Sequence, residues 1–96
     1  MAKFAIGQLV ATRRVADTMA GNPAFASFVE ESFNRYQMCD WGNLCKEDAE
    51  MNDNSVSKND NRILAAYDHP KHLNWRLWII TEHDRSYTTI LFPHEY

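Results

Sequence analysis

Residues 81–86, with the sequence TEHDRS, place a run of ionisable side chains between two apolar segments. Glu82 and Asp84 are carboxylates at positions i and i+2, His83 stands between them, and Arg85 follows. Carboxylates and imidazole are the groups that most often transfer protons in general acid–base catalysis. If the strand pleat continues here, Glu82 and Asp84 share one face and His83 points to the other. Neither carboxylate could then orient the imidazole, which disfavours catalysis.

The same residues also suit a tight turn. Asp84 can close an Asx-turn, Ser86 can bond to the backbone, and Arg85 can pair with Glu82 or with a terminal carboxylate. We interpret the segment as a rigid charged hairpin that is either structural or used to bind a partner. The sequence assigns no catalytic residue to it.

A second candidate lies in the segment CDWG, at residues 39–42. Asp40 is placed to cap the following turn, and Trp41 combines a large apolar area with an indole N–H that needs an acceptor. Trp41 is therefore either a core residue or a partly exposed stacking anchor. Tryptophan and arginine are enriched at binding hot spots, so Arg62 and Arg85 join it as candidate binding residues.

Metal sites and cofactor sites are disfavoured. Glu47 and Glu50 share a face of a predicted helix, with Asp48 between them, but the E-x-x-H pattern of carboxylate-bridged metal centres is absent from it. These acids are expected to form a solvated face, or to meet a basic partner. Cys39 and Cys45 have no second cysteine pair, and the histidines do not stand at zinc-finger spacing. The sequence predicts no metal and no cofactor.

Length and charge narrow the function classes. With 96 residues the chain can build one compact core, so we expect a single domain over residues 1–96. Its apolar runs are far shorter than the roughly 20 residues of a membrane helix, and the start lacks the features of a signal peptide, which indicates a cytosolic protein. The net charge is −3 and basic residues do not cluster, which disfavours nucleic-acid binding through a basic face.

The elements that would position these residues follow from hydrophobic periodicity. Asn22 and Pro23 are typical of a helix start, and the apolar residues after them recur at helical spacing. Short polar side chains over 52–61 should make the third helix fray into a loop. The predicted elements are a strand over 3–11, helices over 13–20, 23–38 and 44–54, and strands over 62–67, 75–81 and 86–92.

Short connections make the last three strands an antiparallel meander. The predicted fold class is therefore α+β, with the 23–38 helix packed across the sheet and the N-terminal strand completing it. Alternation places Trp75, Leu77 and Ile79 on one face and Trp78 and Ile80 on the other. Because both faces carry apolar bulk, the second face is either covered by other parts of the chain or left open for a partner.

Several motifs carry a resemblance to a known family. The segments DWG, ED, RIL and WIITE-DRS-TTILFP-EY resemble those of small bacterial proteins carried by plasmids, phages and integrated mobile elements. Such proteins are often named plasmid-related proteins or subunits of a type I restriction enzyme. A methyltransferase subunit needs a Gly-rich cofactor loop and an aromatic catalytic motif, and this sequence has neither. His83, His94 and the polar segment 52–61 depart from the pattern. The resemblance implies a genetic context and no catalytic residue.

These features favour a binding protein of mobile elements that blocks or modulates a host defence complex, of the CRISPR or restriction type, by protein–protein contact. A module that binds a nucleotide or another small molecule is the alternative, with Trp41 or Tyr67 stacking on the base and Arg62, Arg76 or Arg85 holding phosphate. An enzyme is disfavoured, and a homo-oligomer stays open. The candidate binding residues are Asp40, Trp41, Glu47, Asp48, Arg62, Glu82, Asp84 and Arg85.

Overall fold

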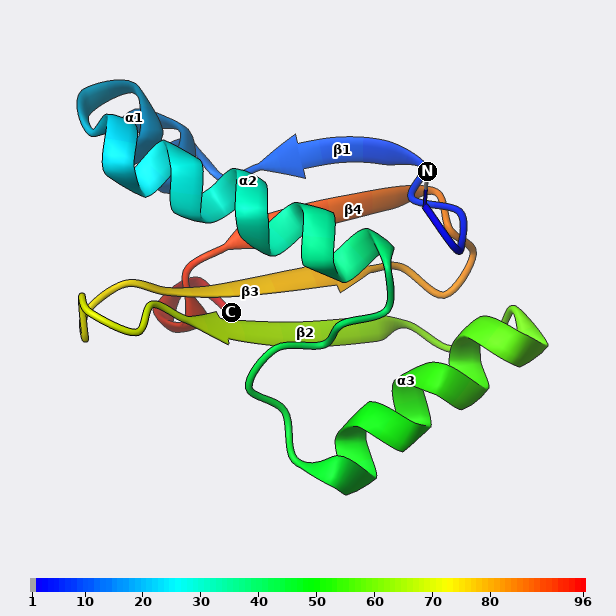
Figure 1. Cartoon of the computed structure of the whole chain (residues 1–96). Coiled ribbons are helices and arrows are strands. Elements are labelled where there is room, and N and C mark those ends of the chain that lie inside the picture. The colour runs from blue at the N-terminus through cyan, green and yellow to red at the C-terminus, as the bar shows by residue number, and fades with distance from the viewer. Residues whose placement is uncertain (1) are drawn as a thin grey trace.

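The computed structural model describes residues 2–96, and Figure 1 shows the path of the chain. Its elements follow the predicted order and confirm the α+β class. They are β1 (Gln8–Ala11), α1 (Arg13–Gly21), α2 (Pro23–Gln37), α3 (Lys46–Lys58), β2 (Ile63–Asp68), β3 (Arg76–Thr81), β4 (Tyr87–Leu91) and the short 3-10 helix η1 (Pro93–Glu95).

The strands form one sheet in the order β1-β4-β3-β2. Strands β2, β3 and β4 are antiparallel neighbours, as the short connections predict, and β1 joins the free side of β4 in parallel. Helices α1 and α2 lie over one face of the sheet, whereas α3 lies beside the β2 edge (Figure 1). Strand β1 therefore forms the opposite edge.

Helix α2 has the start that its sequence predicts. The Asn22 side chain accepts a hydrogen bond from the Phe25 N–H, and Pro23 occupies the first turn, where it costs no backbone bond. Its buried face packs onto Leu77 and Ile79 of β3. This face comprises Phe25, Phe28, Val29, Ser32 and Tyr36, so the helix and the sheet share one core.

The first strand is shorter than predicted. It begins at Gln8 instead of Lys3, because Gly7 adopts a φ of 67° that breaks the extended backbone. A Cβ at Gly7 would also collide with the carbonyl groups of Arg85 and Ser86, so only glycine fits this close approach.

Helix α3 is longer than predicted, and the expectation that residues 55–58 form part of a frayed loop is wrong. The polar side chains that compete with a helix in isolation make tertiary contacts here. The Asn52 amide donates to the Leu64 carbonyl at 2.8 Å, and Ser55 is buried. Asn59 then ends the helix in a left-handed conformation, with φ 53°.

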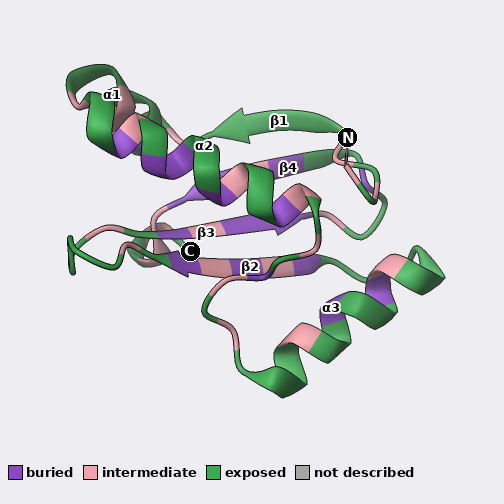
Figure 2. Cartoon of the chain, viewed as in Figure 1, coloured by how far each residue is buried: buried purple, intermediate pink, exposed green. Residues whose placement is uncertain are grey.

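The second sheet face is partly covered by the end of the chain. Trp78 packs against Tyr96 with 5.3 Å between the ring centroids, and Ile80 and Leu91 on the same face are buried. Figure 2 shows the contrast between the strands: β3 is buried along most of its length, whereas β1 is exposed throughout. Within residues 2–96, no helix is both long and apolar enough to cross a membrane.

Candidate functional site

The arginine of the predicted charged hairpin points into the protein. Arg85 is only 8% exposed and has a φ of 60°. Its Nη1 donates to the carbonyls of Asn61 at 2.7 Å, Glu82 and His83, and its Nη2 donates to those of Ser55 at 2.9 Å and Asp60 at 3.1 Å. The expectation that Arg85 pairs with a carboxylate, of Glu82 or of the chain terminus, and is open to a partner is wrong. It is a clip between the β3–β4 turn and the end of α3.

The acids of the hairpin stay near the surface. Asp84 is exposed, and its Oδ1 accepts a hydrogen bond from the Ser86 N–H at 3.0 Å, which is the Asx-turn that the sequence predicts. Hydrogen bonds from Ser86 lower the pKa of the Asp84 carboxyl. Glu82 is half-buried beside it. The two acids could meet a basic partner, but Arg85 does not stand with them.

Trp41 is a core residue and no stacking anchor. Its side chain is 5% exposed, and its Nε1 donates to Asp53 of α3 at 2.9 Å. Asp40, next to it, accepts from the Nε of Arg35 at 2.8 Å and from the Gly42 N–H at 3.1 Å, so it caps the turn as expected. The hydrogen bond from Arg35 lowers the pKa of the Asp40 carboxyl.

The remaining candidates are spread over the molecule. Glu47 and Asp48 are exposed in the first turn of α3. Arg85 meets the same helix at Ser55, which at 1.5 Å per residue lies about 11 Å further along its axis. Tyr67 is fully buried and donates to the Asp40 carbonyl, so its ring is not open to a ligand. The predicted residues therefore do not form one surface.

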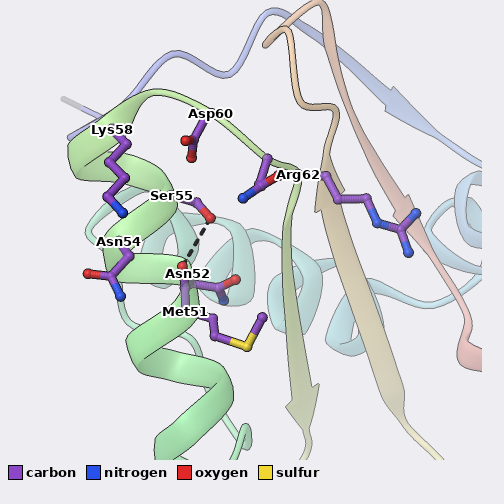
Figure 3. Close-up of a pocket in the computed structure, with 8 residues that line it drawn as sticks. Met51, Asn52, Asn54, Ser55, Lys58, Asp60 and Arg62 are labelled. Carbon is purple, nitrogen blue, oxygen red and sulfur yellow. Dashed lines mark hydrogen bonds between the residues drawn. The ribbon is translucent and has the colours of Figure 1, made fainter.

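Arg62 lies on the sheet face opposite α2, at the side of a polar hollow beside α3. Its guanidinium donates to the Tyr96 hydroxyl and lies 5.3 Å from the centre of that ring. In Figure 3 the Arg62 side chain extends away from α3. The hollow has a volume of about 490 Å³ and is lined by Met51, Asn52, Asn54, Ser55, Lys58, Asp60, Asn61 and Arg62. Its lining is mostly polar, unlike the apolar lining typical of small-molecule sites.

The two edges of the sheet differ in their hydrogen bonding. At the β2 edge, the Asn52 side chain bonds to Leu64, the Asn43 N–H donates to Ala66, and the Asn43 side chain accepts from Asp68. Leu64, Ala66 and Asp68 are the alternate residues of β2 whose backbone groups point away from β3. That edge is closed by residues from outside the sheet.

The edge formed by β1 is open. Gln8 and Thr12 donate their N–H groups toward β4, to the carbonyls of Ser86 at 3.1 Å and Ile90 at 3.0 Å. Because neighbouring residues of a strand direct their backbone groups to opposite sides, Leu9 and Ala11 direct theirs away from β4. No other strand within residues 2–96 pairs with this side of β1.

An apolar groove adjoins this open edge, on the face that carries the helices. It is about 260 Å³ in volume, and the buried side chains of Val29 and Ile90, which are 3% and 4% exposed, belong to its walls. Glu30 of α2 is the charged member of the lining. The full lining is Leu9, Ala11, Met19, Val29, Glu30, Phe33 and Ile90.

Sequence reasoning missed this groove. The strand that contains Leu9 was predicted, but its place at an edge depends on its pairing with β4, which is remote in sequence. One signal was present in the sequence: Phe33 is a large apolar residue outside the apolar stripe of its helix. Apolar side chains beyond the core-facing stripe indicate a second apolar contact.

No group of three or more histidine, cysteine, aspartate or glutamate side chains that could hold a metal ion occurs within residues 2–96. Comparison of the chain with protein-family models, with curated proteins and with solved structures found no match.

Proposed function

We propose that this protein acts by binding a partner protein through the open edge of β1 and the adjoining apolar groove. By occupying its partner in this way, it blocks or modulates a host defence complex of the CRISPR or restriction type. The observation that carries the proposal is that outward backbone groups, at Leu9 and Ala11, and an apolar groove lie side by side. Many proteins recognise a peptide segment in this way: a strand edge bonds to the peptide backbone, and pockets beside it hold the peptide side chains.

The contrast between the sheet edges supports this choice of surface. Proteins usually cover or shorten an exposed strand edge, because unpaired N–H and C=O groups recruit other chains. Here Asn43 and Asn52 cover β2, whereas no residue within 2–96 bonds to the outward backbone groups of Leu9 and Ala11 in β1, which lie beside apolar side chains. An edge left open in a chain that closes its other edge is a candidate binding surface.

The size of the groove favours a protein partner over a small ligand. Pockets for small molecules are typically about 300–1,000 Å³ and enclose most of the ligand. At about 260 Å³ this groove has room for a large side chain, with the rest of the contact supplied by the strand edge. Val29 and Ile90 are held in the core, so the groove is formed before binding and little ordering cost is expected.

The sequence motifs support the biological side of the proposal. The segments from DWG to TTILFP resemble proteins carried by plasmids and phages, which meet the defence systems of their host. A chain of 96 residues can inhibit a larger complex when it presents a rigid surface with a few apolar anchors.

The test is affinity purification of the tagged chain from a bacterium that carries it, followed by identification of co-purifying proteins and reconstitution with the purified partner. We expect a host protein in fixed stoichiometry. Leu9→Lys should abolish the complex, whereas Val10→Lys, on the neighbouring residue that faces away from the groove, should keep it. Equal binding by both variants, or a bound nucleotide in place of a protein, would refute the proposal.

A further inference from the structure

Building on the proposed function, we infer that the part of the partner bound here is an extended segment that adds to β1 as a fifth strand of the sheet. One large apolar side chain of this segment enters the groove, and a lysine or arginine on the same face of the segment pairs with Glu30. The recognised pattern is thus an apolar residue and a basic residue at alternate positions of an exposed strand.

The backbone of β1 selects an extended chain. Leu9 and Ala11 each present one N–H donor and one C=O acceptor to the outside, because Gln8 and Thr12 direct theirs toward β4. Groups spaced two residues apart on a strand match the spacing of an added strand, and they do not match the backbone of a helix. With Gln8–Ala11 as the template, the paired segment is about four or five residues long.

The side chains around the groove select the apolar residue. In the parallel register Leu9 pairs with Thr88 and Ala11 with Ile90, and Thr88 and Ile90 belong to the buried face of β4. Leu9 and Ala11 therefore point toward α2, and the same-facing residues of an added strand point there too. Diagonal neighbours on adjacent strands lie about 7–8 Å apart, within the reach of leucine, methionine or phenylalanine.

The charge beside the groove selects the basic residue. Glu30 is exposed, whereas the other lining residues are uncharged. A cation on the bound segment gains from pairing with it, and an acid at the same place is repelled, so Glu30 contributes to specificity more than to affinity. Because residues of one strand face the same side at every second position, the apolar and basic residues are separated by one residue.

The test uses a phage-displayed library of random heptapeptides selected on the full chain. We expect enrichment of an apolar residue followed two positions later by lysine or arginine, or the reverse order. Glu30→Lys should exchange the basic residue for an acidic one, whereas Glu31→Lys, on the next residue of α2 and outside the groove, should leave the selection unchanged. Peptides without this alternation, or the same peptides from both variants, would overturn the inference.

Strand addition itself is tested with Ala11→Pro. The Ala11 N–H points away from β4, so proline removes an outward donor and no bond of the sheet. Binding of a selected peptide should weaken at least tenfold, and Val10→Ala should change it less than threefold. In amide-resolved NMR titrations, the Leu9 and Ala11 signals should shift more than those of β2. Unchanged binding by Ala11→Pro with a native spectrum would overturn the strand-addition mode.

The outcomes separate this inference from the proposed function. One outcome is that the purified partner binds the unaltered chain, loses binding to Leu9→Lys, and binds equally well to Ala11→Pro and in the presence of a competing selected peptide. In that case the proposed surface is correct, but the partner does not bind it as an extended segment. If no protein partner is found, the proposed function fails. Light scattering adds a control: a dimer of the chain that Ala11→Pro converts to a monomer would identify a second copy as the occupant and overturn the inference.

Discussion

Replacing the buried arginine by a side chain of similar length should destabilise the fold more than any change at the charged surface. In Arg85→Met the guanidinium is lost while most of the apolar stem stays. The bonds lost join the β3–β4 turn to the carbonyls of Ser55, Asp60 and Asn61, at 2.9, 3.1 and 2.7 Å. The turn and the end of α3 would then lose their main polar connection.

The size of the expected loss in the free energy of unfolding depends on which other partners each carbonyl keeps. Hydrogen bonds to charged groups contribute about 1.5–3 kcal/mol each. Ser55 keeps part of its bonding, because the N–H of Asn59 also donates to its carbonyl. Methionine also removes the burial cost of a guanidinium whose Nε has no partner within residues 2–96. We expect a net loss of about 3 kcal/mol in the free energy of unfolding, or roughly 12–24 °C in Tm for a domain of this size.

The assay is urea denaturation followed by circular dichroism, with Arg76→Met as the matched control. Arg76 is exposed and pairs with Asp68 at 3.8 Å, so its loss should cost at most about 0.5 kcal/mol. Hydrogen exchange should also show faster exchange over residues 55–58 in Arg85→Met. If the free energy of unfolding of Arg85→Met lies within about 1 kcal/mol of that of the unaltered chain, Arg85 is not the polar anchor that its contacts indicate.

Three further predictions concern local contacts. Tyr36→Phe removes the hydroxyl that lies 2.6 Å from the Thr81 hydroxyl in the core, and thermal denaturation should show a loss of about 1–2 kcal/mol. Cys45 is the N-cap of α3 without a side-chain capping bond, so Cys45→Asp should raise the free energy of unfolding by about 0.5–1 kcal/mol, and a drop would contradict this. The hydrogen bond from Arg35 lowers the pKa of the Asp40 carboxyl, so the ionised carboxyl stabilises the fold at pH values above its unfolded pKa, near 3.8. This contribution is lost as the pH falls through the lower folded pKa. In acid titrations, the free energy of unfolding of Asp40→Asn should lack the part of the decrease that protonation of Asp40 causes.

The sequence predicts best those elements whose signals are local. Asn22 and Pro23 mark the start of α2, and the observed helix ends one residue from the predicted end. The meander of β2, β3 and β4 follows from short connections and strands rich in β-branched residues, and its pairing is confirmed. In these elements the local preference and the tertiary contacts favour the same structure.

The sequence fails where a distant partner overrides the local preference. Asn52 and Ser55 disfavour a helix in isolation, but contacts to Leu64 and from Arg85 keep the helix intact past them. The inward direction of Arg85 could not be predicted either, because the carbonyls of Asn61, Asp60 and Ser55 that it binds outside its own turn belong to residues 24 to 30 positions away. The sequence left Trp41 open as either a core residue or a partly exposed stacking anchor. The hydrogen bond from its indole N–H to Asp53, a residue 12 positions away, holds it in the core.

The charged hairpin and the proposed binding edge are connected through the backbone. The Gln8 N–H donates to the Ser86 carbonyl, and Gly7 packs so closely against Arg85 and Ser86 that a Cβ would not fit. Arg85 in turn ties this turn to α3. The hairpin, which the sequence left open as either structural or used to bind a partner, therefore anchors the start of the strand proposed to bind.

This connection makes the two roles separable by experiment. Loss of Arg85 should weaken partner binding only in proportion to the unfolded fraction, since the hydrogen bonds of Arg85 go to none of the residues that line the groove. Loss of the exposed Leu9 side chain should weaken binding with little change in the free energy of unfolding, because surface substitutions usually cost less than about 0.5 kcal/mol. The contrary result is that Arg85→Met abolishes binding at a temperature where the variant is fully folded. The hairpin would then belong to the binding surface, and the β1 edge by itself would not account for recognition.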